Sequence, residues 1–389
     1  MNYRLNQKNG DSISLLGFGC MRFPGDRKET EKLLLTAIAE GVNFFDTAYI
    51  YGNSEIELGS ILKDYDKRKE VKIATKISPA MLRKKEDFDK YLEKQLVRLQ
   101  TDYIDYYFIH MLTDRKVWQR LIGIGIEEWI EKQKTKGRIR NIGFSYHGGK
   151  EEFIKICDAY TWEFCMIQYN YLDEHTQAGR KGLQYAAVKG LPVIVMAPLR
   201  GGMLANNLPK EVAKIFEQAN QEWSPAEWSF RWLFNQPEII CVLSGMRNMP
   251  ALQENLRIAK TAGVGDFGEE NQEMIEKARR AFNEIANVPC TGCDYCMPCP
   301  QGVDIPTCLS CYNIITTEGV FRATAKYVMQ TSIKVTPQVA SLCNQCGVCE
   351  SKCPQKIAIS EELKHTSKRF EKAIYRPALY FVKRFFQGG

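Results

Sequence analysis

The 389-residue sequence contains no uninterrupted apolar run of about 18 residues, the length at which a helix begins to span a bilayer. Its first residues, MNYRLNQKNGDS, are polar and lack the apolar core of a signal peptide, so we expect no membrane span and no secretion. It also lacks the G-x-G-x-x-G pattern of dinucleotide-binding sheets, of which Gly17-Phe18-Gly19 is only a fragment. With 44% hydrophobic and 25% charged residues, the composition predicts an ordinary soluble globular protein.

Cysteine, by contrast, is abundant and concentrated. The chain has 14 cysteines, and most of them fall in two spaced runs near the C-terminus. The second run matches the bacterial ferredoxin pattern C-x2-C-x2-C-x3-C-P, and the first is one residue shorter. The runs are Cys290-x2-Cys293-x2-Cys296-x2-Cys299-Pro300 and Cys343-x2-Cys346-x2-Cys349-x3-Cys353-Pro354. The spacing predicts two 4Fe–4S clusters and a protein that handles single electrons.

In two-cluster ferredoxins the fourth cysteine of each run binds the other cluster. Carried over to this sequence, one cube has Cys290, Cys293, Cys296 and Cys353, and the other has Cys343, Cys346, Cys349 and Cys299. A further pair, Cys308-x2-Cys311, lies between the runs. It either supplies the fourth ligand of the first cube, because the step before Cys299 is unusual, or forms a packed, inert pair.

Two other uses of cysteine compete with this interpretation. Four-cysteine zinc sites usually show two separated C-x2-C pairs rather than three consecutive steps followed by Cys-Pro. Disulfides suit small secreted domains, whereas free thiols and clusters fit a reducing cytoplasm. The formal net charge of +7 would fall to about +3 with two cubes of roughly −2 each, so we expect no nucleic-acid partner.

The first 286 residues alternate short apolar segments with helical patterns, which predicts a (β/α)8 TIM barrel with its active site at the carboxyl ends of the strands. A doubly wound sheet is the alternative. The predicted strands are Leu15–Met21, Asn43–Ala48, Val71–Ile77, Tyr103–Met111, Ile139–Tyr146, Phe164–Tyr171, Pro192–Leu199 and Ile239–Met246. The predicted helices include Glu29–Glu40, Ser54–Asp64, Glu86–Gln100, Lys116–Lys136 and Pro250–Thr261, and Tyr3–Ser14 reads as a hairpin.

The rest of the chain divides into two parts. Residues 287–360 are predicted to form a small, mainly α-helical dicluster domain, because the gap between the cysteine runs is long and helical in pattern. Residues 361–389 are aromatic and basic, with seven Lys or Arg against the single acid Glu371 between Lys364 and Arg384. This C-terminal helix either packs on its own domain or contacts an acidic partner or a membrane surface.

Four polar side chains fall at the carboxyl ends of successive strands. Asp46 and Tyr51 follow the second strand, Lys76 ends the third, and His110 ends the fourth. A buried lysine needs a counter-charge, which Asp46 provides. We expect the ammonium to lower the pKa of Tyr51, making it a proton donor, and His110 to orient a carbonyl oxygen.

This set resembles the aldo-keto reductase family over about residues 10–262. The resemblance rests on Phe45-Asp46-Thr47-Ala48 and Tyr51-Gly52-Asn53-Ser54-Glu55. It implies that Tyr51 is the general acid/base, that Lys76 and Asp46 tune it, and that His110 orients the substrate. Together with the cysteine runs, the chain resembles the iron–sulfur-containing branch of that family, found in anaerobic bacteria and archaea.

The resemblance also implies a nicotinamide site. Ser145 and Gln168 would hold the carboxamide, and the pyrophosphate and adenosine positions would be Pro198, Leu199, Gly201, Gly245, Arg247, Glu254 and Asn255. Arg247 suits a 2′-phosphate, which favours NADPH over NADH. Two positions depart from the family pattern: Met196 replaces the aromatic residue that stacks on nicotinamide in many relatives, and Ala251 replaces a residue that often contacts the adenine-side phosphate.

These observations predict an oxidoreductase that transfers a hydride between NADPH and a small carbonyl or alcohol, with two 4Fe–4S clusters relaying electrons, possible exchange with a redox protein partner, and no readable substrate signature. Each cube carries one electron whereas hydride carries two, so direct coupling needs a further group. The alternative is a nucleotide-holding redox sensor or electron-transfer protein whose clusters are regulatory or structural.

Overall fold

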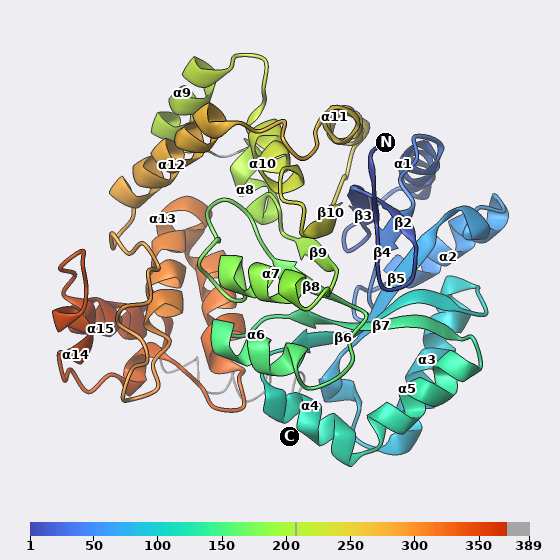
Figure 1. Cartoon of the computed structure of the whole chain (residues 1–389), viewed down its shortest axis with the longest axis horizontal. Coiled ribbons are helices and arrows are strands. Elements are labelled where there is room, and N and C mark those ends of the chain that lie inside the picture. Colours follow the sequence, from blue (N-terminus) through green and yellow to red (C-terminus); the bar gives the residue numbers. More distant parts are fainter. Residues whose placement is uncertain (207, 372–389) are drawn as a thin grey trace.

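The computed structural model describes residues 1–206 and 208–371, and its centre is a closed barrel of eight parallel strands (Figure 1). Each predicted strand is present, and the last pairs with the first to close the barrel, which confirms the (β/α)8 fold over a doubly wound sheet. The strands are β3 (Leu16–Gly19), β4 (Phe44–Asp46), β5 (Lys72–Ile77), β6 (Ile104–Leu112), β7 (Ile139–Tyr146), β8 (Phe164–Gln168), β9 (Val193–Met196) and β10 (Ile239–Ser244).

Side chains alternate along each strand between two apolar cores, one inside the barrel and one between the strands and the outer helices. In β6, Tyr106 and Phe108 belong to the cluster inside the barrel, while Tyr107 and Ile109 belong to the cluster between strands and outer helices. Successive side chains of a strand point to opposite faces, so an apolar run on a barrel strand fills both cores. The barrel interior is therefore packed, and its polar chemistry is confined to the carboxyl ends of the strands.

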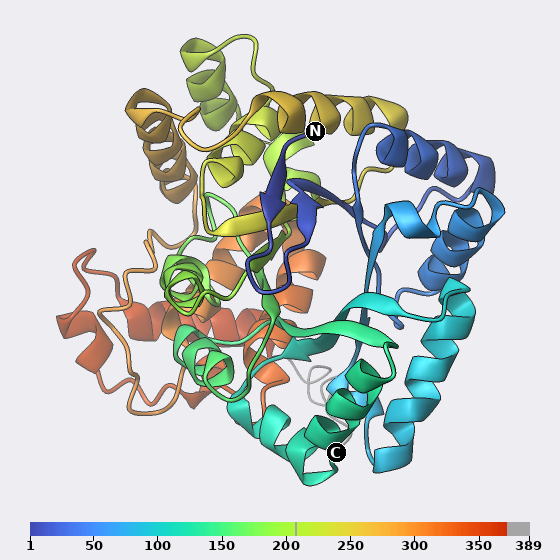
Figure 2. The same ribbon diagram turned by 45° about the vertical axis from the view of Figure 1, so that its right-hand side comes forward.

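Helices surround the barrel and cover its outer core (Figure 2). One predicted helix is wrong: Lys116–Lys136 is two helices, because Gly125 between them has φ 90°, a conformation that other residues rarely adopt. The helices of this part are α1 (Arg27–Ala39), α2 (Ser54–Asp64), α3 (Lys85–Leu99), α4 (Arg115–Gly123), α5 (Ile126–Thr135), α6 (Lys150–Cys157), α7 (Gly179–Val188), α8 (Met203–Asn206), α9 (Lys210–Ala219), α10 (Pro225–Phe234), α11 (Met249–Thr261) and α12 (Glu269–Glu284).

The predicted hairpin is present and covers the amino-terminal end of the barrel. Strands β1 (Tyr3–Leu5) and β2 (Ser12–Ser14) pair antiparallel. From the loop between them, Asn9 Nδ2 donates to Asn141 Oδ1 at 2.9 Å, and Asp11 Oδ2 accepts from the hydroxyl of Tyr106 at 2.7 Å. Both partners lie near the starts of their strands, so the hairpin is opposite the active-site end.

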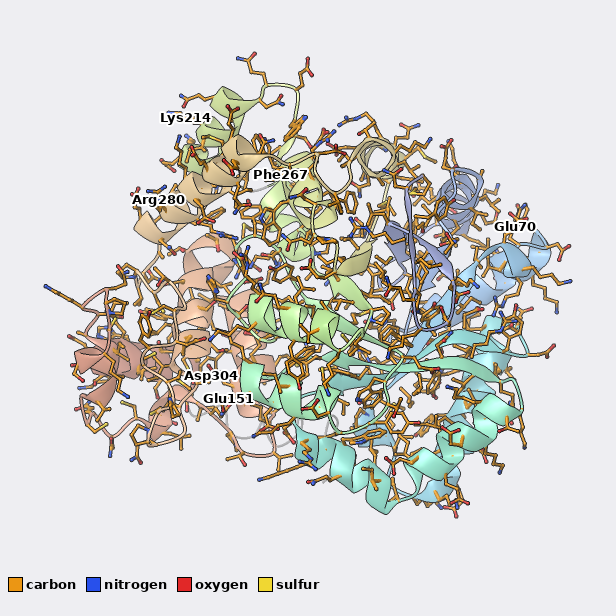
Figure 3. All side chains as sticks on the ribbon, viewed as in Figure 1. Glu70, Glu151, Lys214, Phe267, Arg280 and Asp304 are labelled. Carbon is orange, nitrogen blue, oxygen red and sulfur yellow. The ribbon has the colours of Figure 1, made fainter. Side chains whose placement is uncertain are left out.

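The cysteine-rich region forms a second, mainly helical unit with its own apolar cluster, which begins at Val288 and ends at Phe370. Asp304, labelled in Figure 3, caps the first helix by accepting from the backbone N–H of Thr307 at 3.3 Å. The helices are α13 (Ile305–Tyr327), α14 (Val348–Ser351) and α15 (Ile359–Phe370).

Helix α15 contains the first ten residues of the predicted C-terminal segment, 361–370. The proposed division at residue 361 crosses this helix, whose Leu363, Thr366 and Phe370 are buried in the second unit. The remainder of the predicted basic helix, residues 372–389, lies outside the described residues. Within the described part of the chain, none of the helices has both the length and the apolar character needed to cross a membrane.

The cysteine-rich unit lies against the active-site end of the barrel. Lys150, at the start of α6, pairs with Asp294 of the first cysteine run. Arg200, which follows β9, lies 3.7 Å (Nε to Oε1) from Glu318 of α13. A side chain built on Gly292 would meet His175, which follows β8. All these barrel residues lie beyond the carboxyl ends of strands, so the cluster unit faces the loops that carry the site.

Candidate functional site

The four predicted catalytic residues lie on neighbouring elements at one end of the barrel. Asp46 ends β4, Lys76 is near the end of β5, His110 is near the end of β6, and Tyr51 is in the loop between β4 and α2. Parallel neighbouring strands end at the same rim, so the order of these residues in sequence becomes adjacency in space.

Asp46 and Lys76 form a buried ion pair. The ammonium of Lys76 contacts the carboxylate of Asp46 and donates to the carbonyl of Thr47 at 2.7 Å, and its side chain is 1% exposed. Burial lowers the pKa of Lys76 and raises the pKa of Asp46, while each partner's charge opposes the shift of the other. An ion pair this deep is held because removing one partner would leave an uncompensated buried charge.

Tyr51 lies beside this pair, with its ring centroid 5.3 Å from Lys76 Nζ. The expectation that the ammonium lowers its pKa is wrong. Burial, followed by the charge of Asp46, raises the pKa of Tyr51, and the opposing effect of Arg22 is smaller. The physical reason is that Asp46 neutralises Lys76, so desolvation of the phenolate dominates. Tyr51 therefore remains protonated and can act as a proton donor.

His110 completes the group and stays neutral. Its ring centroid is 5.9 Å from that of Tyr51, with the two rings at 82°. Burial, then the charges of Lys76 and His147, lowers the pKa of His110 well below its ordinary value. Its Nδ1 is buried without a hydrogen-bond partner among the described residues. A neutral imidazole can donate one N–H to a substrate oxygen.

Sequence reasoning missed His147, which follows β7 two residues beyond Ser145. Burial, then the charge of Lys76, lowers its pKa to about 4. Its place just past the end of β7, at the same rim as His110 near the end of β6, is the signal that could have identified it. Its proximity to Lys76 adds a second neutral imidazole to the rim.

A buried network holds the loop that carries Tyr51. Glu55, fully buried at the start of α2, accepts from Thr75 Oγ1 at 2.6 Å and from Gln95 Nε2 at 2.8 Å. Ser54 Oγ donates to the carbonyl of Cys20 at 2.7 Å. These bonds tie the loop to β5, to α3 and to the residue after β3, which explains physically why Ser54 and Glu55 belong to the same motif as Tyr51.

The predicted nicotinamide residues lie around the same rim, after β7, β8, β9 and β10. Ser145 Oγ accepts from the backbone N–H of Met111 at 2.8 Å. Gln168 Nε2 donates to Asp173 Oδ2 at 2.8 Å, and Asn255 Nδ2 donates to Ser244 Oγ at 3.0 Å. The loop with Pro198, Leu199 and Gly201 follows β9, and Met196 ends that strand.

The predicted adenosine positions gather at the start of α11. Gly245 and Arg247 precede this helix and are exposed, while Glu254 and Asn255 lie one turn further in. Asn248, which the sequence analysis did not select, caps the helix by accepting from the backbone N–H of Ala251 at 2.9 Å. This segment presents an exposed guanidinium beside the N-terminal end of a helix, an arrangement that suits an anion.

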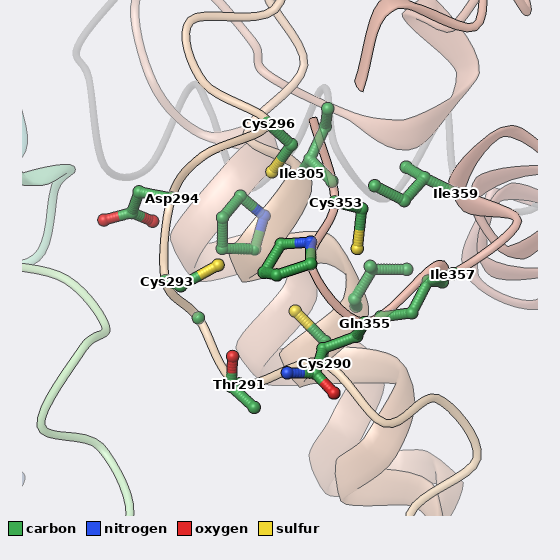
Figure 4. A pocket seen from close by; sticks show the side chains of 14 residues that line it. Cys290, Thr291, Cys293, Asp294, Cys296, Ile305, Cys353, Gln355, Ile357 and Ile359 are labelled. Carbon is green, nitrogen blue, oxygen red and sulfur yellow. The ribbon is translucent and has the colours of Figure 1, made fainter. Parts of the chain in front are cut away.

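The first cysteine set meets at one cavity (Figure 4). Cys290, Cys293 and Cys296 of the first run and Cys353 of the second run turn their sulfur atoms toward this space. Among the described residues, no three Cys, His, Asp or Glu converge closely enough to hold one metal ion. Four thiols that face one space without meeting at a single point fit a cube better than they fit zinc.

Six other cysteines of this unit do not line the first cavity: Cys299, Cys308, Cys311, Cys343, Cys346 and Cys349. Cys343 and Cys346 precede α14, and Cys349 lies within that helix. The backbone N–H of Gln345 donates to Cys343 Sγ at 3.4 Å, as expected of a cluster-binding loop. Cys308 and Cys311 are buried in α13 and do not line the first cavity. The fourth thiol there is that of Cys353, so the alternative use of the Cys308 pair finds no support.

Comparison with known proteins agrees with both halves of the chain. Residues 15–266 match the aldo/keto reductase family, and residues 289–358 match the 4Fe-4S dicluster domain. The uncharacterized oxidoreductase YrpG of Bacillus subtilis is 29% identical over 55% of this chain and 71% of its own length. The glyoxal reductase of the same organism is 28% identical over 69% of this chain and 89% of its own.

The barrel also resembles solved structures. The holo form of aldo-keto reductase AKR11C1 from Bacillus halodurans superposes with a TM-score of 0.59 at 23% identity, over 72% of this chain and 96% of the other. This likeness supports the fold, and the match over residues 15–266 supports the family. The chain belongs to the aldo/keto reductase family and carries a 4Fe-4S dicluster domain at its C-terminal end.

Proposed function

We propose that the barrel reduces a small aldehyde or ketone with NADPH, and that the dicluster domain carries single electrons to or from a redox protein partner. The observation that supports this most is the group of Tyr51, Lys76, Asp46 and His110 at one rim of the barrel. A protein that only holds a nucleotide has no need of a protonated tyrosine beside a buried ion pair.

Each residue has a role that follows from its charge state. Bound NADPH would supply the hydride. Tyr51, kept protonated by burial, would donate its hydroxyl proton to the developing alkoxide, and neutral His110 would donate a hydrogen bond to the same oxygen. The ammonium of Lys76, 5.3 Å from the ring, would offset part of the cost of the phenolate that remains until Tyr51 regains a proton, whereas the charge of Asp46 opposes that phenolate. A raised tyrosine pKa favours carbonyl reduction over alcohol oxidation, because oxidation would need the phenolate at the start.

The choice of NADPH is supported by Arg247. Its side chain is exposed beside the capped start of α11 and has no ion-pair partner among the described residues. A guanidinium binds phosphate through two parallel hydrogen bonds, so this position would recognise a 2′-phosphate. The names of relatives point both ways on the nucleotide: one is an NADP(+) aldo-keto reductase of Schizosaccharomyces pombe, and another is an NADH-specific methylglyoxal reductase of Escherichia coli.

The proposed electron carriers are two 4Fe–4S clusters held by the eight cysteines of the two runs. Their place supports a relay, because the loop around the first cavity contacts the barrel through Asp294 and Lys150. Thiolate-bound clusters and free thiols persist in a reducing compartment, which supports a cytoplasmic location.

The test is anaerobic turnover of the holoprotein with NADPH across a panel of small aldehydes and dicarbonyls. Tyr51→Phe should lower kcat/KM for reduction by about a hundredfold or more while the Kd for NADPH stays unchanged, because only the proton donor is lost. Phenylalanine keeps the ring, so the fold is preserved. Unchanged turnover in this variant would contradict the role of Tyr51. Tight NADPH binding with no turnover of any carbonyl would favour the nucleotide-holding sensor.

A further inference from the structure

A buried cluster of charges joins the dicluster domain to the nucleotide side of the barrel. Arg200 Nε lies 3.2 Å from Asp173 Oδ2 of the barrel and 3.7 Å from Glu318 Oε1 of α13. The three side chains are only 8%, 4% and 3% exposed. Arg200 Nε meets neither carboxylate in hydrogen-bond geometry, so the attraction is ionic. At this burial such attractions are weakly screened by solvent and salt.

The shape of α13 places Glu318 in this cluster. Gly319 breaks the helix with φ 79° and ψ 166° immediately after Glu318. In an unbroken helix Glu318 and Lys326 would be separated by about 12 Å along the axis. The break brings Lys326 Nζ to 2.9 Å from Glu318 Oε1. Glu318 is therefore shared between a lysine of its own domain and an arginine of the barrel.

On the barrel side, the cluster reaches the residue expected to hold the nicotinamide carboxamide. Asp173 Oδ2 accepts from Gln168 Nε2 at 2.8 Å and from Asn170 Nδ2 at 2.9 Å. Gln168 Oε1 in turn accepts from Gln177 Nε2 at 3.1 Å. The Gln168 amide is thus fixed in orientation and retains one N–H and one lone pair for a ligand.

The loop after β9 belongs to the same assembly. Ala197 and Arg200 have positive φ values of 56° and 47°, which are uncommon for residues other than glycine and persist only when surroundings hold them. Asn170 Nδ2 also donates to the carbonyl of Ala197 at 3.2 Å. Burial raises the pKa of Asp173, but the charges of Arg200 and Lys326, together with the hydrogen bonds from Asn170 and Gln168, outweigh burial and keep that pKa below its usual value, so the carboxylate is charged.

We propose that Glu318 of the dicluster domain is a positioning residue for the nicotinamide ring, acting through Arg200 and Asp173 on the amide of Gln168. The inference rests on the proposed function, since it requires the nicotinamide to bind at Gln168. It adds that the cluster domain completes the nicotinamide end of the site, so that nucleotide binding depends on a side chain outside the barrel.

The test compares two ligands in titrations of the iron-loaded holoprotein. NADPH contains the nicotinamide, whereas 2′-phospho-ADP-ribose has the same phosphates and adenosine without it. Glu318→Gln should weaken NADPH about tenfold, a typical coupling between distinct sites, and leave 2′-phospho-ADP-ribose unchanged. The matched control is Glu361→Gln, the same chemical change at an exposed position of α15 in the same domain, which should alter neither ligand.

A double-mutant cycle tests the route. In an Arg200→Met background, Glu318→Gln should have no further effect on NADPH, because the connecting side chain is gone. If Glu318→Gln reduces the iron content, the variant Arg200→Lys replaces it in the test, because this change leaves the sequence of the cluster domain unchanged. A lysine lacks the planar guanidinium that faces the carboxylates of Asp173 and Glu318 at the same time. The Arg200→Lys variant should show the same selective loss of NADPH binding.

Three results would overturn the inference. Equal weakening of both ligands would mean a general disturbance of the site, and no weakening of NADPH would mean that Glu318 is only structural. Additive losses in the cycle would exclude the route through Arg200. The titration of the wild type distinguishes failure of this inference from failure of the proposed function. If the wild type binds 2′-phospho-ADP-ribose and NADPH equally, the proposed nicotinamide site itself is contradicted.

Discussion

The charge state of Tyr51 follows from its surroundings rather than from one neighbour. Lys76 is close, but Asp46 neutralises it, so the cost of burying a phenolate prevails and raises the pKa. A group with a raised pKa keeps its proton as pH increases through the ordinary tyrosine range. Carbonyl reduction needs a protonated Tyr51 to supply the proton, whereas alcohol oxidation needs the phenolate to accept one. A raised pKa therefore suits Tyr51 to reduction and makes it a poor base for oxidation.

We therefore predict that kcat for carbonyl reduction is flat from about pH 6 to about pH 9, below the ordinary tyrosine pKa of about 10. The pKa of His110 is lowered, so its neutral form also persists across this range and adds no inflection. The measurement is a pH profile under saturating NADPH. A fall in kcat between pH 7 and pH 9, present in the wild type and absent in Tyr51→Phe, would contradict a raised tyrosine pKa.

The candidate catalytic residues could be selected from sequence because strand order places them. Asp46, Lys76 and His110 each end one of three successive strands, and a barrel brings such ends together. What could not be found was the burial that sets their charge states, or the partners of Gln168. Asp173 and Arg200 lie in loops whose sequence carries no periodic pattern, and Glu318 comes from a different domain.

At the scale of elements, two glycines close together in sequence offer a matched test. Gly125, between α4 and α5, has φ 90°, whereas Gly123 is the last residue of α4 and has open space beside it. Gly125→Ala should lower the free energy of unfolding by about 1–2 kcal/mol, because alanine is strained in the left-handed region. Gly123→Ala should raise it by about 0.5–1 kcal/mol, because alanine favours the helix.

Chemical denaturation of the holoprotein would compare the two variants with the wild type. Neither added methyl group meets a neighbour closely, since the nearest atoms at Gly125 are side-chain carbons of Lys85 at 3.8 Å and none lies within 4 Å at Gly123. The two variants thus differ mainly in backbone conformation. Equal effects of the same sign would mean that the break between α4 and α5 is not set by Gly125.

The break between α4 and α5 is an example of an element boundary that the sequence pattern did not predict. The apolar period continues through residues 116–136, so the pattern predicts one helix, and only the backbone conformation of Gly125 reveals two. Strand ends were extended too far for a related reason: Pro192–Leu199 continues as an apolar run, but β9 ends at Met196 because Ala197 turns to positive φ. The spacing of apolar residues indicates which side chains are buried. Where a helix or strand ends depends on the backbone conformation of single residues such as Gly125 and Ala197.

For the whole molecule, the first cavity combines residues from both ends of the dicluster region. We predict that Cys353→Ala removes the same cluster as Cys290→Ala, leaving about four of eight iron atoms per chain in each variant. The measurements are iron and sulfide content and the electron paramagnetic resonance of the reduced protein. Because the cubes organise this domain, both variants should also melt at a lower temperature.

Cys157→Ala is the control for that experiment, since this buried cysteine is in α6 of the barrel, away from the two runs. It should keep all the iron. If Cys353→Ala and Cys290→Ala leave different resonance signals, the two residues serve different clusters, and the crossing of ligands between the runs is wrong.

The hairpin at the amino-terminal end of the barrel affects the order in which the chain folds during its synthesis. Arg4 of β1 donates to the backbone carbonyls of Phe234, Gln236 and Ile239, which follow it by 230 to 235 residues. At about 5–20 residues per second, a ribosome takes roughly ten to fifty seconds to make those partners. An isolated two-stranded hairpin is marginal in water, so the first-made part of the barrel is among the last to become stable. For that interval the nascent chain exposes open strand edges, the surfaces on which other chains aggregate.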